Sequence, residues 1–272
     1  MPLNNSRTII FIDDECVFCN YWGKFILKHD KSKTLYISPS SSSIFNHIKE
    51  DCEKIPNPKE TIILHHQNTV YERSNAVIVI VSNPMDTMTY LTLKESGLPK
   101  NRIIGMGGAL DSARFRTYLS LALDKPSNDI HGMVIGGHGD TTMIPMTRFA
   151  SYNGIKFNDL LEEKVLEKVA ADTMVGGKTL TGMLGTSAWY APGAAVAFLV
   201  DSILNDQKRI IPCSVYLEGE YGQKDICIGV PVVIGRNGWE NVIDLKLNEK
   251  EQDLFAKSAD AVRNMNSALE SI

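Results

Sequence analysis

The stretch NAVIVIVSNPMDTMTYLTLKESGLPKNRIIGMGGALDSARFR, residues 75–116, decides the fold. It opens with a nearly continuous apolar run that ends in a turn, which is typical of a strand buried on both faces. A helix closed by Gly97 follows, and then a second strand, NRIIGMGG, leads into a second helix, ALDSARFRTYLSLALD. The segment HGMVIGGHGD, residues 131–140, is a third strand that ends in glycines. This alternation predicts a parallel, doubly wound α/β sheet.

The rest of the chain shows a different pattern of predicted helices and strands. Long helical stretches follow residue 148, at residues 159–175 and 195–207, and a strand pair is expected at residues 211–222 and 226–235. A charged terminal helix begins near Asn248. In the first 74 residues we predict a strand at RTIIFID, a helix at CVFCNYWGKFILKHD, a strand at TLYIS, and a hairpin of TIILHH and TVYERS.

Composition and charge narrow the function classes. A hydrophobic fraction of 43%, a charged fraction of 22% and a net charge of −4 are those of a globular protein, with no reason to expect nucleic acid or an anionic membrane as a partner. The start, MPLNNSRTIIFIDD, has no signal-peptide core, and the apolar stretch APGAAVAFLVDSIL is interrupted by Asp201. The 5 cysteines, an odd number, fit reduced thiols. We therefore expect a cytoplasmic protein.

Four polar side chains come at the ends of the predicted strands or just beyond them. GGHGD places His138 at the carboxyl end of a buried strand, where ligands bind in open α/β sheets. Asn83 ends the first parallel strand, while Asp111 and Arg114 lie three residues apart on one face of the helix after the second strand. A lone histidine is more often structural than catalytic, but this setting favours a site.

These residue types suit the oxidation of a 2-hydroxy acid, which needs a base for the hydroxyl proton while a hydride leaves the carbon. A histidine titrating near neutrality can take and return that proton, as His138 would. A carboxylate at its other ring nitrogen fixes the tautomer, which suits Asp111. A guanidinium that grips a substrate carboxylate through two parallel hydrogen bonds suits Arg114. Asn83 could hydrogen-bond the hydroxyl or the nicotinamide side.

Residues 75–116, with MVIGGHGDTTMIP and LGTSAWYAPGAA further along, resemble the lactate-dehydrogenase-like malate dehydrogenase family. The resemblance runs from about Asn75 to Ile272. It implies NAD-dependent interconversion of L-malate and oxaloacetate, a dicarboxylic acid substrate, and a homo-oligomer, either dimer or tetramer. For the site it implies His138 as proton acceptor, Asp111 as its orienting partner, Arg114 and Asn83 as substrate contacts, and Val81 and Asn83 near the nicotinamide.

The resemblance also implies the domain organisation. Residues 75–147 would be the second half of a dinucleotide-binding domain, and residues 148–272 an α+β substrate and catalytic domain. Residues 1–74 would be a separate, truncated segment. The expected fold class is thus α/β with a mixed sheet. It combines an incomplete doubly wound (Rossmann-like) parallel sheet, an α+β dehydrogenase catalytic domain and a thioredoxin-like N-terminal βαβ segment.

Two features of the family have no counterpart in the first part of the chain. Gly23 is the one glycine before Gly97, so the glycine-rich turn that holds a dinucleotide pyrophosphate is absent there. GMGGAL, residues 105–110, belongs to a later turn. The family's mobile loop carries two further arginines, whereas only Arg7 and Arg73 precede Arg102 here, in no matching context. We therefore predict impaired NAD binding and impaired activity.

A second motif occupies the amino-terminal segment. Cys16 and Cys19 form a C-x-x-C sequence at the predicted start of a helix, where backbone N–H groups and the positive helix end lower a thiol pKa and favour disulfide exchange. No second Cys/His pair completes a zinc site, so no metal is expected. FIDDECVFC and VYERSNAV resemble the DCC-type thiol-disulfide oxidoreductase family over about residues 7–78, although Asp14 stands where that family usually has glycine.

The sequence therefore leaves three functions open. The first is a malate dehydrogenase-like oxidoreductase with NAD as cofactor. The second is a thiol-disulfide oxidoreductase with Cys16 as nucleophile and Cys19 as resolving thiol. The third is a non-catalytic oligomerisation module.

Overall fold

The computed structural model describes residues 8–12, 28, 35–39, 42–43, 63–66, 69–72, 77–186 and 189–271. The chain divides into two compact units, Met1–Ala76 and Val77–Ile272. Cys16, Cys19 and most of the helix predicted around them lie outside the described residues, so the redox motif stays a sequence-based prediction.

The first unit contains a four-stranded sheet in the order β2-β1-β3-β4. β1 and β2 are parallel, and β3 is antiparallel to both β1 and β4. The predicted strands and the predicted hairpin are confirmed. The thioredoxin-like character of the segment stays a prediction. The strands are β1 Thr8–Ile12, β2 Leu35–Pro39, β3 Ile63–His66 and β4 Thr69–Glu72.

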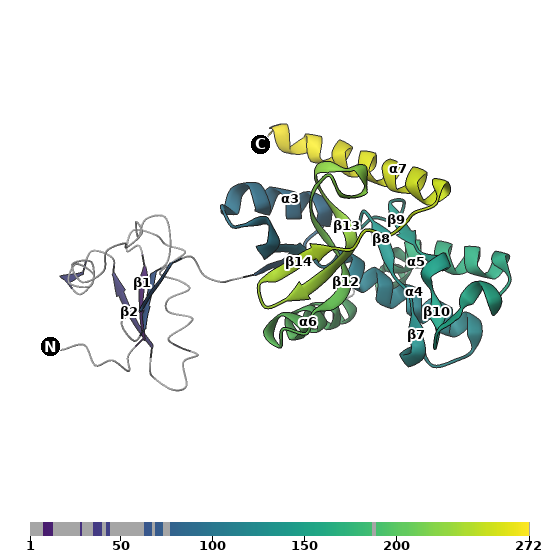
Figure 1. Cartoon of the computed structure of the whole chain (residues 1–272), viewed down its shortest axis with the longest axis horizontal. Coiled ribbons are helices and arrows are strands. Elements are labelled where there is room, and N and C mark those ends of the chain that lie inside the picture. The colour runs from purple at the N-terminus through teal and green to yellow at the C-terminus, as the bar shows by residue number, and fades with distance from the viewer. Residues whose placement is uncertain are drawn as a thin grey trace. The chain divides into compact units, whose positions relative to one another are not determined.

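The second unit is built on a seven-stranded sheet in the order β5-β6-β12-β13-β8-β9, with β14 paired to β13 (Figure 1). A small sheet, β11-β10-β7, lies apart from it. The strands of the large sheet are β5 Ile78–Ile80, β6 Ile103–Gly105, β8 Val134–Gly136, β9 Met143–Pro145, β12 Arg209–Glu218, β13 Lys224–Gly235 and β14 Gly238–Val242. Those of the small sheet are β7 Ile130–His131, β10 Ser151–Tyr152 and β11 Ile155–Lys156.

The large sheet is mixed, as predicted for the fold as a whole, whereas the alternation of strands and helices by itself predicts parallel strands. β5 and β6 are parallel, as expected. β8, however, is antiparallel to both of its partners, β13 and β9. The reason is that the long hairpin β12–β13 is inserted between β6 and β8, and local periodicity carries no signal for a hairpin that comes so much later in the chain. The α/β fold class is confirmed, with β5–β6 the parallel pair among the described strands of this unit.

α3, α4 and α7 begin close to their predicted positions, whereas α5 ends at Leu184 instead of residue 175 and α6 begins at Tyr190 instead of residue 195. α3 ends at Gly97, whose left-handed φ of +63° fits glycine best. α7 begins at Asn248, where the Asn248 side chain and the Glu251 carboxylate each accept the other residue's backbone N–H. The helices are α3 Met85–Ser96, α4 Gly107–Leu123, α5 Glu163–Leu184, α6 Tyr190–Leu204 and α7 Glu249–Asn266.

Gly107 and Gly108, which we expected to end a strand, are instead the first residues of α4. A Cβ atom at Gly108 would lie 2.8 Å from the carbonyl oxygen of Pro212 on β12. The two glycines therefore let α4 begin in close contact with the sheet, a packing role that sequence periodicity does not reveal.

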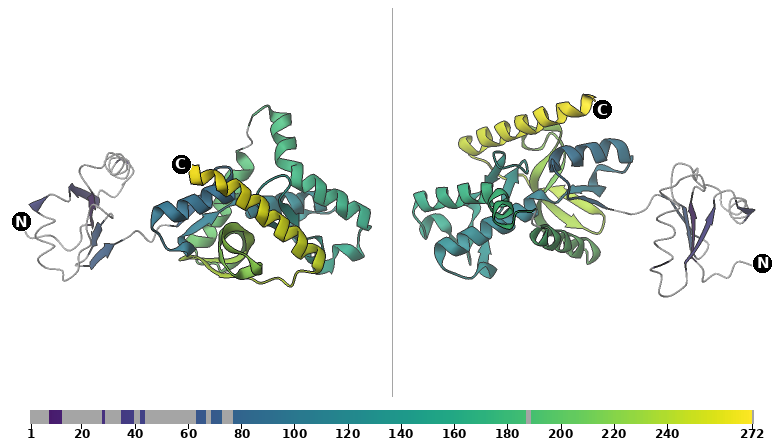
Figure 2. Two further views of the ribbon diagram at one scale, coloured as in Figure 1. Left: turned by 90° about the horizontal axis from the view of Figure 1, so that it is seen from above. Right: turned by 180° about the vertical axis from the view of Figure 1, so that it is seen from behind.

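The core has two parts. In the larger, apolar side chains of β12 and β13 pack against helices on both sides of the sheet, with α3 and α7 on one face and α6 on the other (Figures 1 and 2). The smaller lies mainly between α4, α5 and β8, around Phe115 and Phe157. None of the described helices is long and apolar enough to cross a membrane.

Candidate active site

The structure brings three of the predicted site residues together. His138 follows the end of β8, and its Nδ1 lies 2.6 Å from Oδ2 of Asp111 on α4. The other carboxylate oxygen of Asp111 accepts a hydrogen bond of 3.1 Å from Nη1 of Arg114. The side chain of Asp111 is 2% exposed, that of His138 is 11% exposed and that of Arg114 is 19% exposed. A buried carboxylate thus joins an imidazole to a guanidinium.

The imidazole lies directly against the first turn of α4. A Cβ atom at Gly107 would come within 2.7 Å of Cγ of His138, a distance that real Cβ atoms do not tolerate. Glycine at this position is therefore required for the observed place of the ring. The contact also puts the ring beside the helix that carries Asp111.

The guanidinium of Arg114 lies against a second pair of glycines. A Cβ atom at Gly177 on α5 would be 3.3 Å from both Nη1 and Nη2 of Arg114, and one at Gly176 would be 3.5 Å from its Cδ. The guanidinium therefore packs against the backbone of α5, where the two glycines have no side chains. This contact limits the position of the guanidinium and leaves its hydrogen-bond donors uncovered by any side chain of Gly176 or Gly177.

Opposing effects set the proton affinity of His138. Burial by itself lowers the pKa of the imidazole, because it disfavours the charged form. The hydrogen bond to Asp111 and the negative charges of Asp111 and Asp86 act in the opposite direction and outweigh burial, while the charge of Arg114 opposes them. The net result is a pKa raised above the ordinary value of 6.5.

Hydrogen bonds from three other elements hold the backbone around His138. The N–H of His138 donates to Oδ2 of Asp86 at 2.7 Å, and Oδ1 of Asp86 accepts from the hydroxyl of Ser214 at 2.6 Å. The N–H of Gly137 donates to the hydroxyl of Ser258 at 2.8 Å, and this hydroxyl donates to the carbonyl of Thr142 at 2.8 Å. The loop is thus bonded directly to α3 and α7, and indirectly to β12 through Asp86.

Sequence reasoning missed Asp86, Ser214 and Ser258. An acidic residue in the first turn of a helix ordinarily indicates a favourable interaction with the helix dipole in solvent. The 6% exposure of Asp86 is a tertiary property with no local signature. The two serines stand in a strand and a helix without any motif. The one sequence feature that could have indicated a role for Asp86 is its position three residues after Asn83, a predicted site residue.

Asn83 and Val81 lie at the carboxyl end of β5, and both are exposed. Val81 is 52% exposed. No hydrogen bond joins Asn83 to His138, Asp111 or Arg114, all of which are described. The structure therefore leaves Asn83 at the rim of the sheet, connected to His138 through the turn that contains Asp86.

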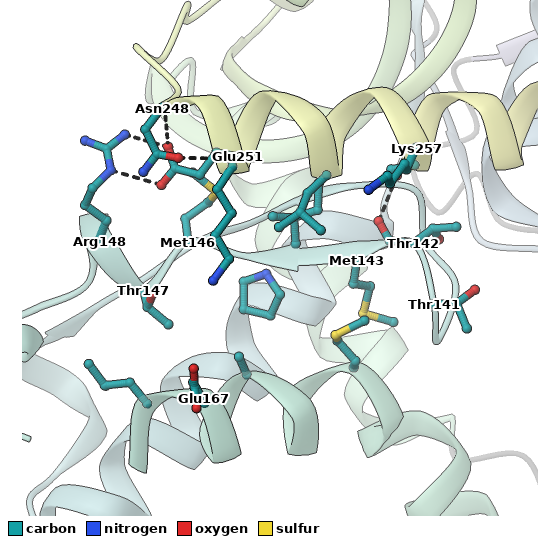
Figure 3. Close-up of a pocket in the computed structure, with 18 of the residues that line it drawn as sticks. Thr141, Thr142, Met143, Met146, Thr147, Arg148, Glu167, Asn248, Glu251 and Lys257 are labelled. Carbon is teal, nitrogen blue, oxygen red and sulfur yellow. Dashed lines mark hydrogen bonds and ion pairs between the residues drawn. The ribbon is translucent and has the colours of Figure 1, made fainter. Parts of the chain in front are cut away.

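A cavity of about 520 Å³ lies next to this site, between β9, α5 and α7 (Figure 3). Thr141 and Thr142, just beyond the His138 loop, form one end of it, and Arg148 with Glu251 forms the other. Neither His138 nor Arg114 lines it. The cavity is therefore distinct from the contacts around the imidazole, although Thr142 and Ser258 belong to both.

Comparison with known proteins identifies relatives of this arrangement. The family model for the lactate/malate dehydrogenase alpha/beta C-terminal domain matches residues 108–271, and that for the NAD binding domain matches residues 59–105. A malate dehydrogenase of Flavobacterium frigidimaris is 74% identical over 206 residues, which are 76% of this chain and 66% of that protein.

Solved structures agree. Malate dehydrogenase from Salinibacter ruber has a TM-score of 0.70 at 42% identity, covering 72% of this chain and 64% of that one. Lactate dehydrogenase from Cryptosporidium parvum, solved with lactic acid and nicotinamide adenine dinucleotide, has a TM-score of 0.70 at 35% identity, covering 73% and 64%. The chain thus spans just under two thirds of the length of these relatives. The matched domain models and the shared fold nevertheless place it plainly: the chain belongs to the lactate/malate dehydrogenase family.

Proposed function

We propose that this chain catalyses the NAD-dependent interconversion of L-malate and oxaloacetate, with His138 as the group that moves the hydroxyl proton. The observation that carries the proposal is the hydrogen bond of 2.6 Å between Nδ1 of His138 and Asp111. Because Nδ1 is engaged, Nε2 is the nitrogen that faces a substrate. Four-carbon specificity is proposed from the relatives, whose name is malate dehydrogenase.

The proton step follows from the site's charges. In malate oxidation, Nε2 of His138 accepts the proton of the substrate hydroxyl, and the carboxylate of Asp111 stabilises the imidazolium that forms. In oxaloacetate reduction the same nitrogen returns the proton to the new alkoxide. NAD, when bound, supplies the acceptor for the hydride. The raised pKa of His138 makes the protonated form easily accessible near neutral pH.

Arg114 is the proposed anchor for the substrate carboxylate. A guanidinium has five N–H donors, and one nitrogen of Arg114 is engaged with Asp111. The remaining donors can make two parallel hydrogen bonds to a carboxylate. Since Arg114 and His138 are both bonded to Asp111, a 2-hydroxy acid gripped by Arg114 brings its hydroxyl toward the imidazole.

The described residues fit the nicotinamide end of NAD. β5 and β6 are parallel, and ligands of α/β sheets bind beyond the carboxyl ends of such strands. Val81 and Asn83 lie at that end of β5, and the exposed side chain of Val81 offers an apolar surface to a ring. Val81 and Asn83 are therefore the proposed nicotinamide contacts.

We further propose that NAD binding and turnover are weaker than in the malate dehydrogenases that this chain resembles. The support is the sequence: Gly23 is the one glycine before Gly97, so the chain has no glycine-rich turn for the pyrophosphate there. The region before the β5 strand also lacks the two arginines that the family resemblance leads us to expect. Reduced cofactor affinity and a raised KM for oxaloacetate follow.

The test is NADH oxidation with oxaloacetate, and with pyruvate as the competing substrate. His138→Gln should lower kcat by about 10²–10⁴-fold, the usual contribution of general acid–base catalysis. His131→Gln is the matched control, because His131 is an exposed histidine on β7. The proposal fails if His138→Gln leaves the rate unchanged, or if pyruvate is reduced faster than oxaloacetate.

A second candidate function concerns Cys16 and Cys19, which lie outside the described residues. The parallel pairing of β1 and β2 favours it, because a parallel pair needs a crossover between its strands, and the motif falls in that connection. Insulin reduction by the whole chain, compared with Cys16→Ser, tests this DCC-type activity. Equal rates for the two proteins would remove it.

The proposal includes a homo-oligomer in the cytosol. Its support is the large apolar side chains exposed at and beside α6: Trp189 is 69% exposed, Tyr190 is 85% exposed and Leu204 is 69% exposed. Light scattering should give a multiple of 30.2 kDa. A clean monomer at micromolar concentration would count against the oligomer.

The domain boundary near residue 147 is likewise proposed, and limited proteolysis would test it.

A further inference from the structure

Asp86 is a buried carboxylate for which sequence and family comparison provide no role. It lies in the first turn of α3 and is 6% exposed. Both of its oxygens are used: one accepts the backbone N–H of His138 and the other accepts the hydroxyl of Ser214. No lysine or arginine of the described residues makes an ion pair with it.

Burial of such a group is unfavourable for the fold alone. Burying a carboxylate without a cation destabilises its charged form, and burial accordingly raises the pKa of Asp86. The hydrogen bonds from Ser214 and His138 and the charge of His138 oppose that rise without cancelling it. A neutral side chain could cap the same N–H at lower cost, which points to a use for the charge itself.

The charge acts on His138. Asp111 on α4 contacts the imidazole of His138, whereas Asp86 on α3 accepts the backbone N–H of the same residue. Arg114 on α4 bonds to Asp111, and the hydroxyl of Ser258 on α7 accepts the N–H of the neighbouring Gly137. Arg114 makes protonation of the ring less favourable, whereas Asp111 and Asp86 make it more favourable. Asp86 thus supplies the second negative charge in a group where one carboxylate is already shared with a guanidinium.

We propose that Asp86 is a positioning residue for His138: it fixes the backbone of the histidine loop and, through its negative charge, holds the proton on the imidazole. The inference rests on the proposed function for its catalytic meaning, because it concerns the group that moves the proton. It also links two parts of the site. Asp86 follows Asn83 by three residues, so one turn carries both the nicotinamide-side contact and the anchor of the proton carrier.

The variant Asp86→Asn separates charge from geometry. Its amide oxygen can accept the N–H of His138 and its NH2 group can donate to the Ser214 oxygen, so both hydrogen bonds survive while the charge is lost. The measurement is an NMR titration of the ring Hε1 signal of His138, assigned by its absence in His138→Gln. We expect the titration midpoint to move to lower pH in Asp86→Asn.

Asp253→Asn is the control, because it removes the same charge from an exposed position on α7, where the side chain is 73% exposed. This variant should leave the midpoint unchanged. An Asp86→Asn midpoint equal to that of the parent, or higher, overturns the proposal. If Asp86→Asn does not fold, the parent chain still decides: the carboxyl carbon of Asp86 should show an inflection at the pH where His138 titrates. A signal without that inflection rejects the coupling.

Catalysis provides an independent readout. In Asp86→Asn the acid limb of kcat/KM for malate should shift to lower pH by the same amount as the NMR midpoint. The NMR experiment needs no turnover, so a chain without dehydrogenase activity would refute the proposed function while leaving this inference testable. If Asp86→Asn were active and the titration midpoint of His138 did not shift, the inference about Asp86 would be refuted while the proposed function would stand.

Discussion

His138 is fixed by contacts of three different kinds. Its ring nitrogen is bonded to Asp111, its backbone N–H to Asp86, and its ring lies against Gly107, where no side chain would fit. Each contact comes from α3 or α4, the two helices that follow the parallel strands. The imidazole therefore has little freedom to rotate, which is a condition for efficient proton transfer to a bound substrate.

The glycine contact leads to a direct prediction. Gly107→Ala would place a methyl group 2.7 Å from Cγ of His138, so the ring must move away from its present position. Because a displacement of about 1 Å can cost about 10²-fold in rate, we expect a loss of that order in kcat with oxaloacetate.

Gly193→Ala on α6 is the matched control, since no atom lies within 4 Å of the added Cβ. The control should retain the parent rate and melt no earlier than the parent. Equal rates for the two variants would show that the ring tolerates the methyl group and that the contact is unimportant.

The raised pKa of His138 predicts the pH dependence of both reaction directions. Malate oxidation needs the neutral imidazole, so its kcat/KM should rise with pH through a midpoint above 6.5. Oxaloacetate reduction needs the imidazolium and should fall through the same midpoint. Initial rates between about pH 5.5 and 9 would measure both limbs. A midpoint at or below 6.5 would contradict the raised pKa that Asp111 and Asp86 give His138.

The same shift affects stability. A group whose pKa is higher in the folded state stabilises the fold below its unfolded-state pKa, and this contribution disappears as the pH rises through the folded value. His138 should therefore add to stability in mildly acid solution and add nothing well above neutrality. In His138→Gln, this contribution to the pH dependence of the free energy of unfolding should be absent.

Residue-scale sequence reasoning succeeded where chemistry and spacing coincide. The three-residue spacing of Asp111 and Arg114, the position of His138 at a strand end and the family resemblance together predicted the group, and the structure brings the three side chains into contact. The sequence could not predict the roles of Asp86, Gly107 and Gly177. Each role depends on a contact with a residue from another part of the chain. A contact between α5 and the Arg114 guanidinium has no signature in either segment.

At the scale of the elements, the end of α3 and the start of α7 were the best predicted features, whereas the end of α5 and the start of α6 were not predicted. Gly97 ends α3 with a left-handed φ, and Asn248 begins α7 with a reciprocal pair of side-chain hydrogen bonds to Glu251. Both are local signals. Strand pairing was predicted less well, since the partner of β8 is decided by a hairpin far along the chain.

The start of α7 gives an element-scale prediction. Asn248→Ala removes the side chain that accepts the Glu251 N–H at 2.9 Å, leaving that donor without its partner. Loss of such a cap typically costs about 1 kcal/mol, which should appear as a lower urea midpoint at unchanged slope. Asn264→Ala, at an exposed position in the last turn of the same helix, should be neutral or slightly stabilising. Equal losses in both variants would argue against the cap.

At the scale of the whole molecule, the chain consists of two units, and the sheet of the second begins with the parallel pair β5–β6. The family model for the NAD binding domain matches residues 59–105, whereas the C-terminal model matches residues 108–271. The proposed proton carrier and substrate anchor thus fall in the C-terminal match, and the proposed nicotinamide contacts in the shorter one.

This division predicts which half of the cofactor contributes affinity. If the nicotinamide end is held by Val81 and Asn83 and no glycine-rich turn grips the pyrophosphate, reduced nicotinamide mononucleotide should bind about as tightly as NADH. Fluorescence titration of both ligands measures this directly. The malate dehydrogenase of Flavobacterium frigidimaris, of which this chain covers 66%, is the comparison, and there we expect NADH to bind more tightly than the mononucleotide. A strong preference of this chain for NADH would reveal a pyrophosphate site that we have not identified.

The insertion of β12–β13 between β6 and β8 has a consequence for how the protein is made. Ser214 pairs with Gly105 and Gly229 with Gly136, so the hairpin is the bridge between the strand leading to Asp111 and the strand leading to His138. Synthesis runs from the amino terminus, and both strands leave the ribosome well before their bridge. A nascent chain released after residue 208 would carry all the proposed catalytic groups but would lack the two strands that join β6 to β8 in the sheet.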